Sequence, residues 1–151
     1  MSLADDAVEA RAQGWRTLAS LHAQIEDKLE RALQRDHDLS VSEYSVLDAL
    51  GRQDGFHLRM NQLSAVVVLS HSATTRLVAR LEERGLLERY LCETDRRGIY
   101  TEVTAAGQKL LATARPTHDV ALSEALTKAE ELPELAPLVA ALSKLVYPAM
   151  V

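Results

Sequence analysis

The sequence predicts a mainly α-helical protein with a single small β-hairpin, on three observations. In the 151-residue chain, apolar residues recur at spacings of three or four over long stretches, which is typical of amphipathic helices. Residues 86–92 and 99–103 have the composition of two strands around a charged turn, which is the pattern of a hairpin. The longest apolar runs have five residues, far fewer than the roughly 20 that span a bilayer, so no membrane partner is expected.

The first helix is expected over residues 8–35, where six apolar residues share one face. This stripe is longer than the other short elements can cover, so a partner helix, such as one from a second subunit, is expected to cover it. The second helix begins at a capping box, with Ser40 as N-cap and Glu43 as N3 residue, and ends before Gly51. The apolar stripe of the first helix consists of Trp15, Leu18, Leu21, Ile25, Leu29 and Leu33.

Caps and helix breakers define the remaining elements. Ser70 is a good N-cap and Gly85 a good terminator for a fourth helix, and Thr104 caps a fifth helix that Pro116 is expected to bend. The valines at 66–68 favour a strand locally, within a region otherwise expected to be helical. The elements expected after the second helix are an extended segment at 56–59, a third helix at 62–67 capped by Asn61, a fourth at 71–84, the two strands, a fifth from 104 to about 129, and a last helix after Pro133 or Pro137.

This order of helix, short helix, turn, capped helix and hairpin is that of a winged helix-turn-helix. A recognition helix needs small polar residues and arginine in its N-terminal half, because that end enters the major groove of DNA. Arginines at the hairpin tip suit the narrower minor groove, where negative potential is concentrated. The candidate DNA-binding residues are therefore Ser70, His71, Ser72, Thr74, Thr75, Arg76 and Arg80 on the fourth helix, and Asp95, Arg96 and Arg97 at the tip, with Asp95 orienting Arg97.

The run from Leu69 to Arg89, the tip residues Asp95 and Arg97, and the segment 103–107 resemble the MarR family of bacterial transcriptional regulators. The resemblance implies a single MarR-type domain over 1–151, with a winged helix-turn-helix lobe at 39–104 and a helical dimerisation lobe made of 1–38 and 105–151. It implies a homodimeric repressor of a pseudo-palindromic operator, released by a small, often aromatic or phenolic, ligand. The acidic start, without a basic and then apolar signal sequence, predicts a cytoplasmic protein.

Three residues depart from the family pattern. Val66 and Val68 stand where polar residues or glycine are frequent, and Thr101 stands where an apolar residue is usual. These departures concern the packing of the third helix and the second strand. None of them removes a candidate DNA contact.

The net charge of −5 argues against nucleic-acid binding, since that affinity comes largely from neutralised phosphates. The charges are segregated, however: residues 57–104 carry seven arginines against six acids, whereas residues 36–56 carry one arginine against five acids. The acidic second helix favours an alternative, a winged-helix protein-interaction module that does not bind DNA. No nucleophile elbow, phosphate loop, carboxylate pair or metal-ligand spacing is present, so no enzyme, cofactor or metal is expected.

Five residues, of which Arg80 is also a candidate DNA contact, have two interpretations each. Trp15 and His22 lie seven apart on the first helix, where they could line a ligand pocket or form part of a dimer core. Arg80 and Arg84 could contact DNA or pair with nearby glutamates. Cys92 could sense peroxide, but the adjacent Glu93 disfavours the low thiol pKa that such chemistry needs.

Overall fold

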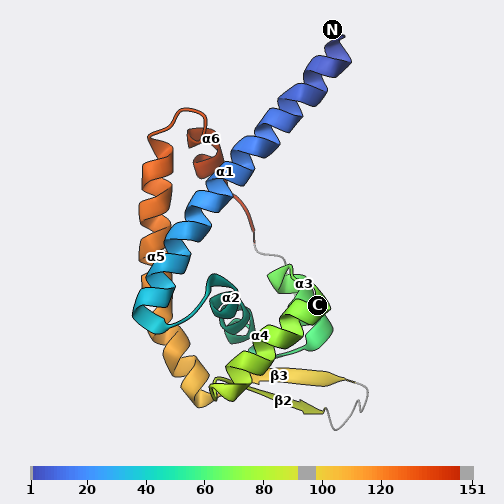
Figure 1. The fold of residues 1–151 in the computed structure, drawn as a ribbon, viewed down its shortest axis with the longest axis vertical. Helices are drawn as coiled ribbons and strands as arrows, with labels where there is room; N and C mark the ends of the chain where they lie inside the picture. Colours follow the sequence, from blue (N-terminus) through green and yellow to red (C-terminus); the bar gives the residue numbers. More distant parts are fainter. Residues whose placement is uncertain (1, 92–97, 147–151) are drawn as a thin grey trace. The chain divides into compact units, whose positions relative to one another are not determined.

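The computed structural model describes residues 2–91 and 98–146 (Figure 1). These ranges form two compact units, residues 1–29 with 119–151 and residues 30–118, and the first and fifth helices each contribute to both units. The elements are α1 (Leu3–His37), α2 (Val41–Gly51), the 3-10 turn η1 (Asp54–Phe56), β1 (His57–Arg59), α3 (Met60–Val67), α4 (His71–Glu83), β2 (Leu87–Leu91), β3 (Ile99–Val103), α5 (Ala105–Glu130) and α6 (Ala136–Leu142).

The mainly α-helical fold with a small antiparallel sheet is confirmed, and the sheet has one more strand than the sequence predicts. β1 pairs with β3, which also pairs with β2, so the strand order is β1-β3-β2. In the register, Leu58 of β1 and Arg89 of β2 both lie opposite Thr101 of β3. β1 was predicted only as an extended segment, because three residues are too few to show an alternating pattern.

Several helix boundaries differ from the prediction. α1 begins at Leu3 rather than near residue 8, and α3 begins at Met60 with Arg59 in place of Asn61 as its N-cap. The side chain of Gln62 accepts a hydrogen bond from the Arg59 backbone, so the capping interaction starts two residues earlier than expected. α5 continues through Pro116 to residue 130.

Local hydrogen bonds explain why the helices of unit 30–118 begin where they do. The Ser40 hydroxyl accepts from the Glu43 backbone N–H at 3.0 Å, and the Glu43 carboxylate accepts from the Ser40 N–H at 3.0 Å, which confirms the predicted capping box. The Ser70 hydroxyl accepts from the Ala73 N–H at 3.1 Å, so it caps α4. The core behind these helices contains the fully buried residues Leu33, Leu39, Leu47, Leu50, Leu63 and Leu81.

Left-handed residues end both helices of the helix-turn-helix. Gly85 has φ +74° after α4, and a glycine adopts this conformation without strain. Val68 has φ 55° and ψ 47° after α3, where its N–H donates to the Ser64 carbonyl. The Leu69 N–H donates to the same carbonyl at 3.2 Å, which closes the turn that leads into α4.

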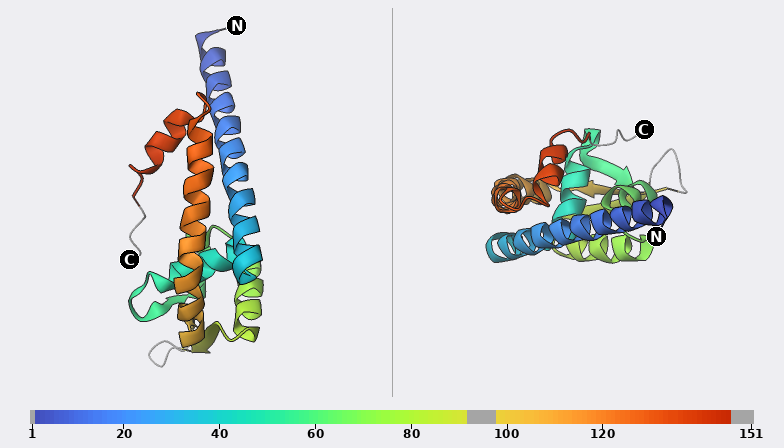
Figure 2. Two further views of the ribbon diagram at one scale, coloured as in Figure 1. Left: turned by 90° about the vertical axis from the view of Figure 1, so that its left-hand side faces the viewer. Right: turned by 90° about the horizontal axis from the view of Figure 1, so that it is seen from above.

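The unit made of residues 1–29 and 119–151 is helical, and Figure 2 gives two further views of α5 and α6. Its small core consists of Leu21, Ala129 and Leu135, packed against Ile25, Leu138 and Val139. Lys28 of α1 and Glu124 of α5 form an ion pair at 2.7 Å. Much apolar surface of this unit stays exposed, including Leu3, Val8, Trp15, Val120, Leu145 and Val146. No helix in the described part of the chain is long and apolar enough to cross a membrane.

Candidate nucleic-acid interface

The N-terminal half of α4 presents the polar residues that the sequence singled out. Ser70, His71, Ser72 and Arg76 are exposed, and Thr75 is half-buried. The Thr75 hydroxyl donates to the His71 carbonyl at 2.9 Å, which leaves its oxygen free to accept a further hydrogen bond. The exposed first turn of this helix offers backbone N–H groups and a positive dipole end, both of which favour an anion.

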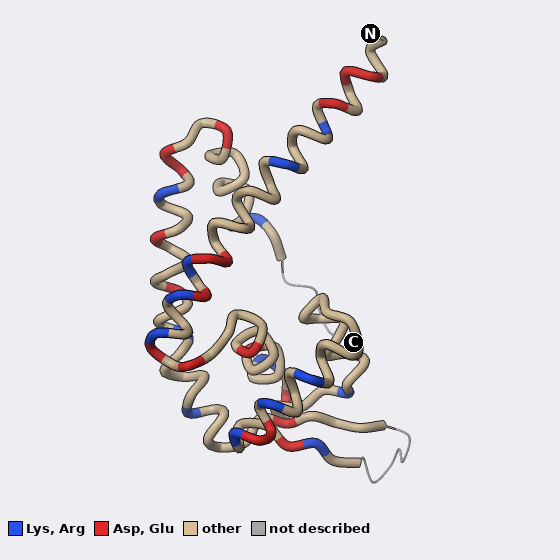
Figure 3. Tube along the Cα trace, viewed as in Figure 1, with Lys and Arg blue, Asp and Glu red and all other residues tan. Residues whose placement is uncertain are grey.

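Arg76 and Arg80 are four residues apart on α4, and both are exposed. Among the described residues, neither makes a hydrogen bond or ion pair with another side chain. A spacing of four places both guanidinium groups on one face of the helix. Figure 3 colours the Lys and Arg positions along the chain blue, and several of them lie on α4.

The other arginines near α4 are engaged within the protein. Arg84 donates to the Asp38 carbonyl at 2.8 Å and lies 3.6 Å from the Glu43 carboxylate, so it has an intramolecular role but not with the glutamates that were expected. Arg89 of β2 forms an ion pair with Glu82 of α4 at 2.9 Å.

Glu82 connects α4 to the strand β2. Its carboxylate accepts hydrogen bonds from the Arg89 guanidinium and, at 3.0 Å, from the Arg89 backbone N–H. The hydrogen bond from the Arg89 side chain is the largest reason why the pKa of Glu82 lies below the ordinary glutamate value. The ion pair between Glu82 and Arg89 therefore links β2 to α4.

The acids of residues 36–56, which made this stretch strongly negative, are largely paired. Asp36 pairs with Arg35 at 2.8 Å, and Asp48 pairs with Arg52 at 2.9 Å and with Arg115 of α5 at 3.2 Å. Each of these acids is thus neutralised at short range. The negative charge of α2 is consequently less available for an external partner than the sequence suggests.

Thr74 does not fit the predicted set of DNA contacts. It is fully buried, and its hydroxyl donates to the Ser70 carbonyl at 2.9 Å. Thr74 precedes the buried residues Leu77, Val78 and Leu81 by three, four and seven positions, so helical spacing places it on the core face. That spacing is the signal by which the sequence could have excluded it.

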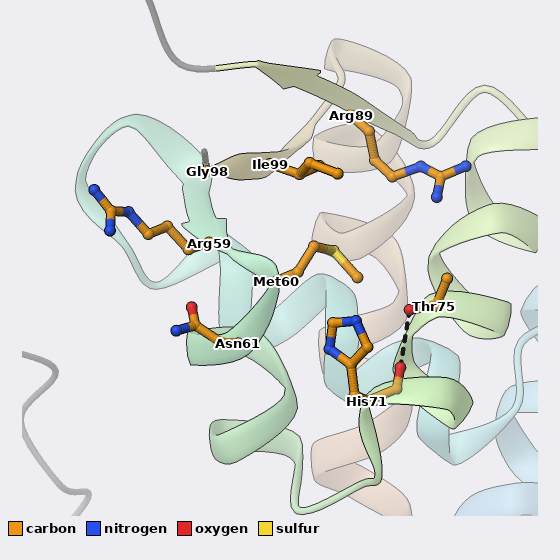
Figure 4. Close-up of a pocket in the computed structure, with 8 residues that line it drawn as sticks. All are labelled: Arg59, Met60, Asn61, His71, Thr75, Arg89, Gly98 and Ile99. Atoms are coloured by element: carbon orange, nitrogen blue, oxygen red, sulfur yellow. Dashed lines mark hydrogen bonds between the residues drawn. The ribbon is translucent and has the colours of Figure 1, made fainter. Parts of the chain in front are cut away.

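A cavity of about 400 Å³ lies beside the start of α4 (Figure 4). Arg89 was not a candidate from the sequence, although strand alternation places it on the same sheet face as Thr101 and Ile99. Figure 4 shows His71 and Thr75 on one side of the cavity, with Met60 and Ile99 facing them. The lining residues are Arg59, Met60, Asn61, His71, Thr75, Arg89, Gly98 and Ile99.

The remaining candidates from the sequence lie elsewhere. Trp15 is 68% exposed, and His22 lies 3.5 Å from Glu26 on the same helix; neither lines the cavity beside α4. Asp95, Arg96, Arg97 and Cys92 fall outside the described residues. Within residues 2–91 and 98–146, no group of three or more potential ligands could hold a metal ion.

Comparison with known proteins agrees with this architecture. Residues 37–98 match the model of the MarR family. The HTH-type transcriptional regulator MhqR of Bacillus subtilis is 27% identical over 114 residues, which are 76% of this chain and 77% of MhqR. The transcriptional regulator HosA of Escherichia coli is 32% identical over 82 residues, which are 54% of this chain and 59% of HosA.

The fold also matches solved structures. Sco3205, a MarR family transcriptional regulator from Streptomyces coelicolor in complex with DNA, superposes with a TM-score of 0.74 and 27% identity. The match covers 95% of this chain and 86% of Sco3205, so it extends well beyond the helix-turn-helix and the sheet. The MarR family model thus matches the segment from α2 to β2, and the fold of nearly the whole chain matches that of a solved MarR family transcriptional regulator.

Proposed function

We propose that this protein binds double-stranded DNA sequence-specifically, with α4 as the recognition helix. The observation that supports this most directly is the pair Arg76 and Arg80, exposed on one face of α4 and without a partner among the described residues. Arginine reads guanine through two hydrogen bonds in the major groove, and one such contact discriminates by about 1–3 kcal/mol. Sco3205, whose fold this chain shares, was solved in complex with DNA.

The roles proposed for the other α4 residues follow from exposure. Ser72 lies four residues before Arg76 on the same face, so we assign both to base edges or nearby phosphates. Ser70 and His71 begin the helix, where the backbone N–H groups favour a phosphate. The interface is completed by the sequence-based proposal that Arg96 and Arg97 enter the minor groove, with Asp95 orienting Arg97.

The proposed regulator is a cytoplasmic homodimer that represses a pseudo-palindromic operator. Exposed apolar residues on the helices of unit 1–29 with 119–151, such as Val8, Trp15 and Val120, support a second copy of the chain as their cover. Two recognition helices in successive major grooves require half-site centres about one helical turn, roughly 10 bp, apart.

The proposed effector is a small aromatic or phenolic molecule. The cavity beside α4 supports an effector site there, because a ligand in it would contact His71 and Thr75, which belong to the proposed DNA interface. Trp15 and His22 are the competing site from the sequence. Trp15 is the single tryptophan, so a ligand that binds beside it should change the protein's fluorescence, whereas a ligand in the cavity should compete with DNA.

The test of DNA binding is an anisotropy titration of the protein with labelled DNA from its own promoter, over a range of salt concentrations. Arg76→Ala should weaken binding about tenfold or more, because a base contact worth about 1–3 kcal/mol is lost. It should also reduce the salt slope by up to about one, because one cation that displaces counterions is removed. Arg11→Ala, which removes an exposed arginine from α1, is the matched control and should leave affinity unchanged. Failure to bind any DNA at low salt would instead favour the winged-helix interaction module.

A further inference from the structure

We propose that Met60 is an oxidation site, whose thioether reacts with small peroxides that enter the cavity beside α4. The first observation is an unusual polar contact in the core. Thr101 is fully buried in β3, and its hydroxyl donates to the Met60 Sδ at 2.9 Å. Among the described residues, the acceptor for the Thr101 hydroxyl is this sulfur. The sulfur of a thioether is a weak hydrogen-bond acceptor.

The second observation is that Met60 also lines an open space. Its side chain faces the cavity together with Ile99, His71 and Thr75 (Figure 4). The cavity has about 400 Å³, against the roughly 30 Å³ that one water molecule occupies in the liquid, so it can admit a molecule as small as hydrogen peroxide. Met60 as a whole is 8% exposed, so this opening is the route by which an oxidant reaches the sulfur.

The reaction balances without any other reagent. A sulfur lone pair attacks one oxygen of the peroxide, the O–O bond breaks, and the departing oxygen takes up the remaining proton to leave as water. The thioether is oxidised to a sulfoxide and the peroxide is reduced. Thr101 slows this step, because its O–H group engages sulfur electron density, and the same O–H then donates to the stronger acceptor that the sulfoxide oxygen provides.

The product would alter the support of the recognition helix. Met60 is the first residue of α3, and its carbonyl accepts from the Ser64 hydroxyl at 3.0 Å. A polar sulfoxide at this nearly buried position disturbs the junction of β1, α3 and β3, from which the turn leads into α4. This consequence rests on the proposed function, whereas the oxidation itself does not.

The test measures the modification directly. The chain has three methionines, Met1, Met60 and Met150, and a Cys92→Ser background removes the competing thiol. The folded protein is treated with hydrogen peroxide, digested and analysed by peptide mass spectrometry. The Met60 peptide is expected to gain one oxygen atom while the circular dichroism spectrum is still native. A Met60 that reacts only after unfolding in urea would overturn the proposal.

Thr101→Val tests the role of the hydroxyl with a variant of nearly the same shape. It should speed Met60 oxidation by up to about fivefold, the equivalent of one neutral hydrogen bond. An unchanged or slower rate would refute the protective role.

Met60→Leu should abolish the loss of DNA affinity that peroxide causes in the Cys92→Ser protein. If the protein binds no DNA at all, the peptide masses still decide on the oxidation site.

Discussion

Val68 stores backbone strain at the turn between α3 and α4, and its replacement by glycine should stabilise the protein. The residue has φ 55°, a left-handed conformation that costs a β-branched residue about 1–2 kcal/mol. Its side chain is 85% exposed, so its removal loses little buried surface. Glycine relieves the strain, but it also gives the unfolded chain more conformational entropy, which lowers the free energy of unfolding by about 0.5–1 kcal/mol. The expected net gain is about 1 kcal/mol.

Thermal or urea unfolding measures this effect. At matched protein concentration, Val68→Gly should raise the Tm by about 2–4 °C, which is the shift expected from 1 kcal/mol in a chain of this size. Val67→Gly is the matched control, because Val67 is the last residue of α3 and half-buried, so glycine there loses helix propensity and packing and should destabilise by about 1 kcal/mol. If Val68→Gly were neutral or destabilising while the control behaved as expected, the left-handed conformation would not be strained.

Two further predictions concern the sheet and its junctions. Gly107→Ala should destabilise by about 2 kcal/mol or more in urea unfolding, because the added methyl group would collide with the Leu86 carbonyl oxygen; a variant of wild-type stability would contradict this packing. The pKa of Glu82 is lower in the folded protein than in the unfolded chain, so its interaction with Arg89 stabilises the fold at pH values above the ordinary glutamate pKa. This stabilisation is lost as the pH falls through the pKa that Glu82 has in the folded protein. Glu82→Gln should therefore flatten the decline of stability below about pH 4, and an unchanged acid profile would refute the assignment.

Signals that lie close together in sequence predicted the fold well. The capping box at Ser40 and Glu43, the N-cap at Ser70 and the terminator at Gly85 all involve partners within a few residues, so their hydrogen bonds follow from spacing alone. Gly107 is different, because the sequence shows only that a glycine stands there. The reason, the close approach of the Leu86 backbone, requires the packed structure.

Features that depend on distant pairing could not be predicted in the same way. Arg84 is paired with Asp38 and Glu43, which are about forty residues away in sequence, rather than with the neighbouring glutamates. Thr101 departs from the family pattern, but its acceptor, the sulfur of Met60, follows directly after β1, the strand paired with β3, and is 41 residues away in sequence. Long-range partners of this kind leave no trace in local periodicity.

The net charge of −5 constrains how strongly such a protein depends on salt when it binds DNA. A formal sum counts Asp48 and Glu82 as free negative charges, although Asp48 is paired with two arginines and Glu82 with Arg89. The cations exposed on α4 are Arg76 and Arg80. In the proposed homodimer they make four cations, so α4 alone neutralises at most about four phosphates and predicts a slope of log affinity against log salt no steeper than about −4. A regulator with so few backbone contacts has weak non-specific binding, and its preference for the operator must therefore come mainly from base contacts.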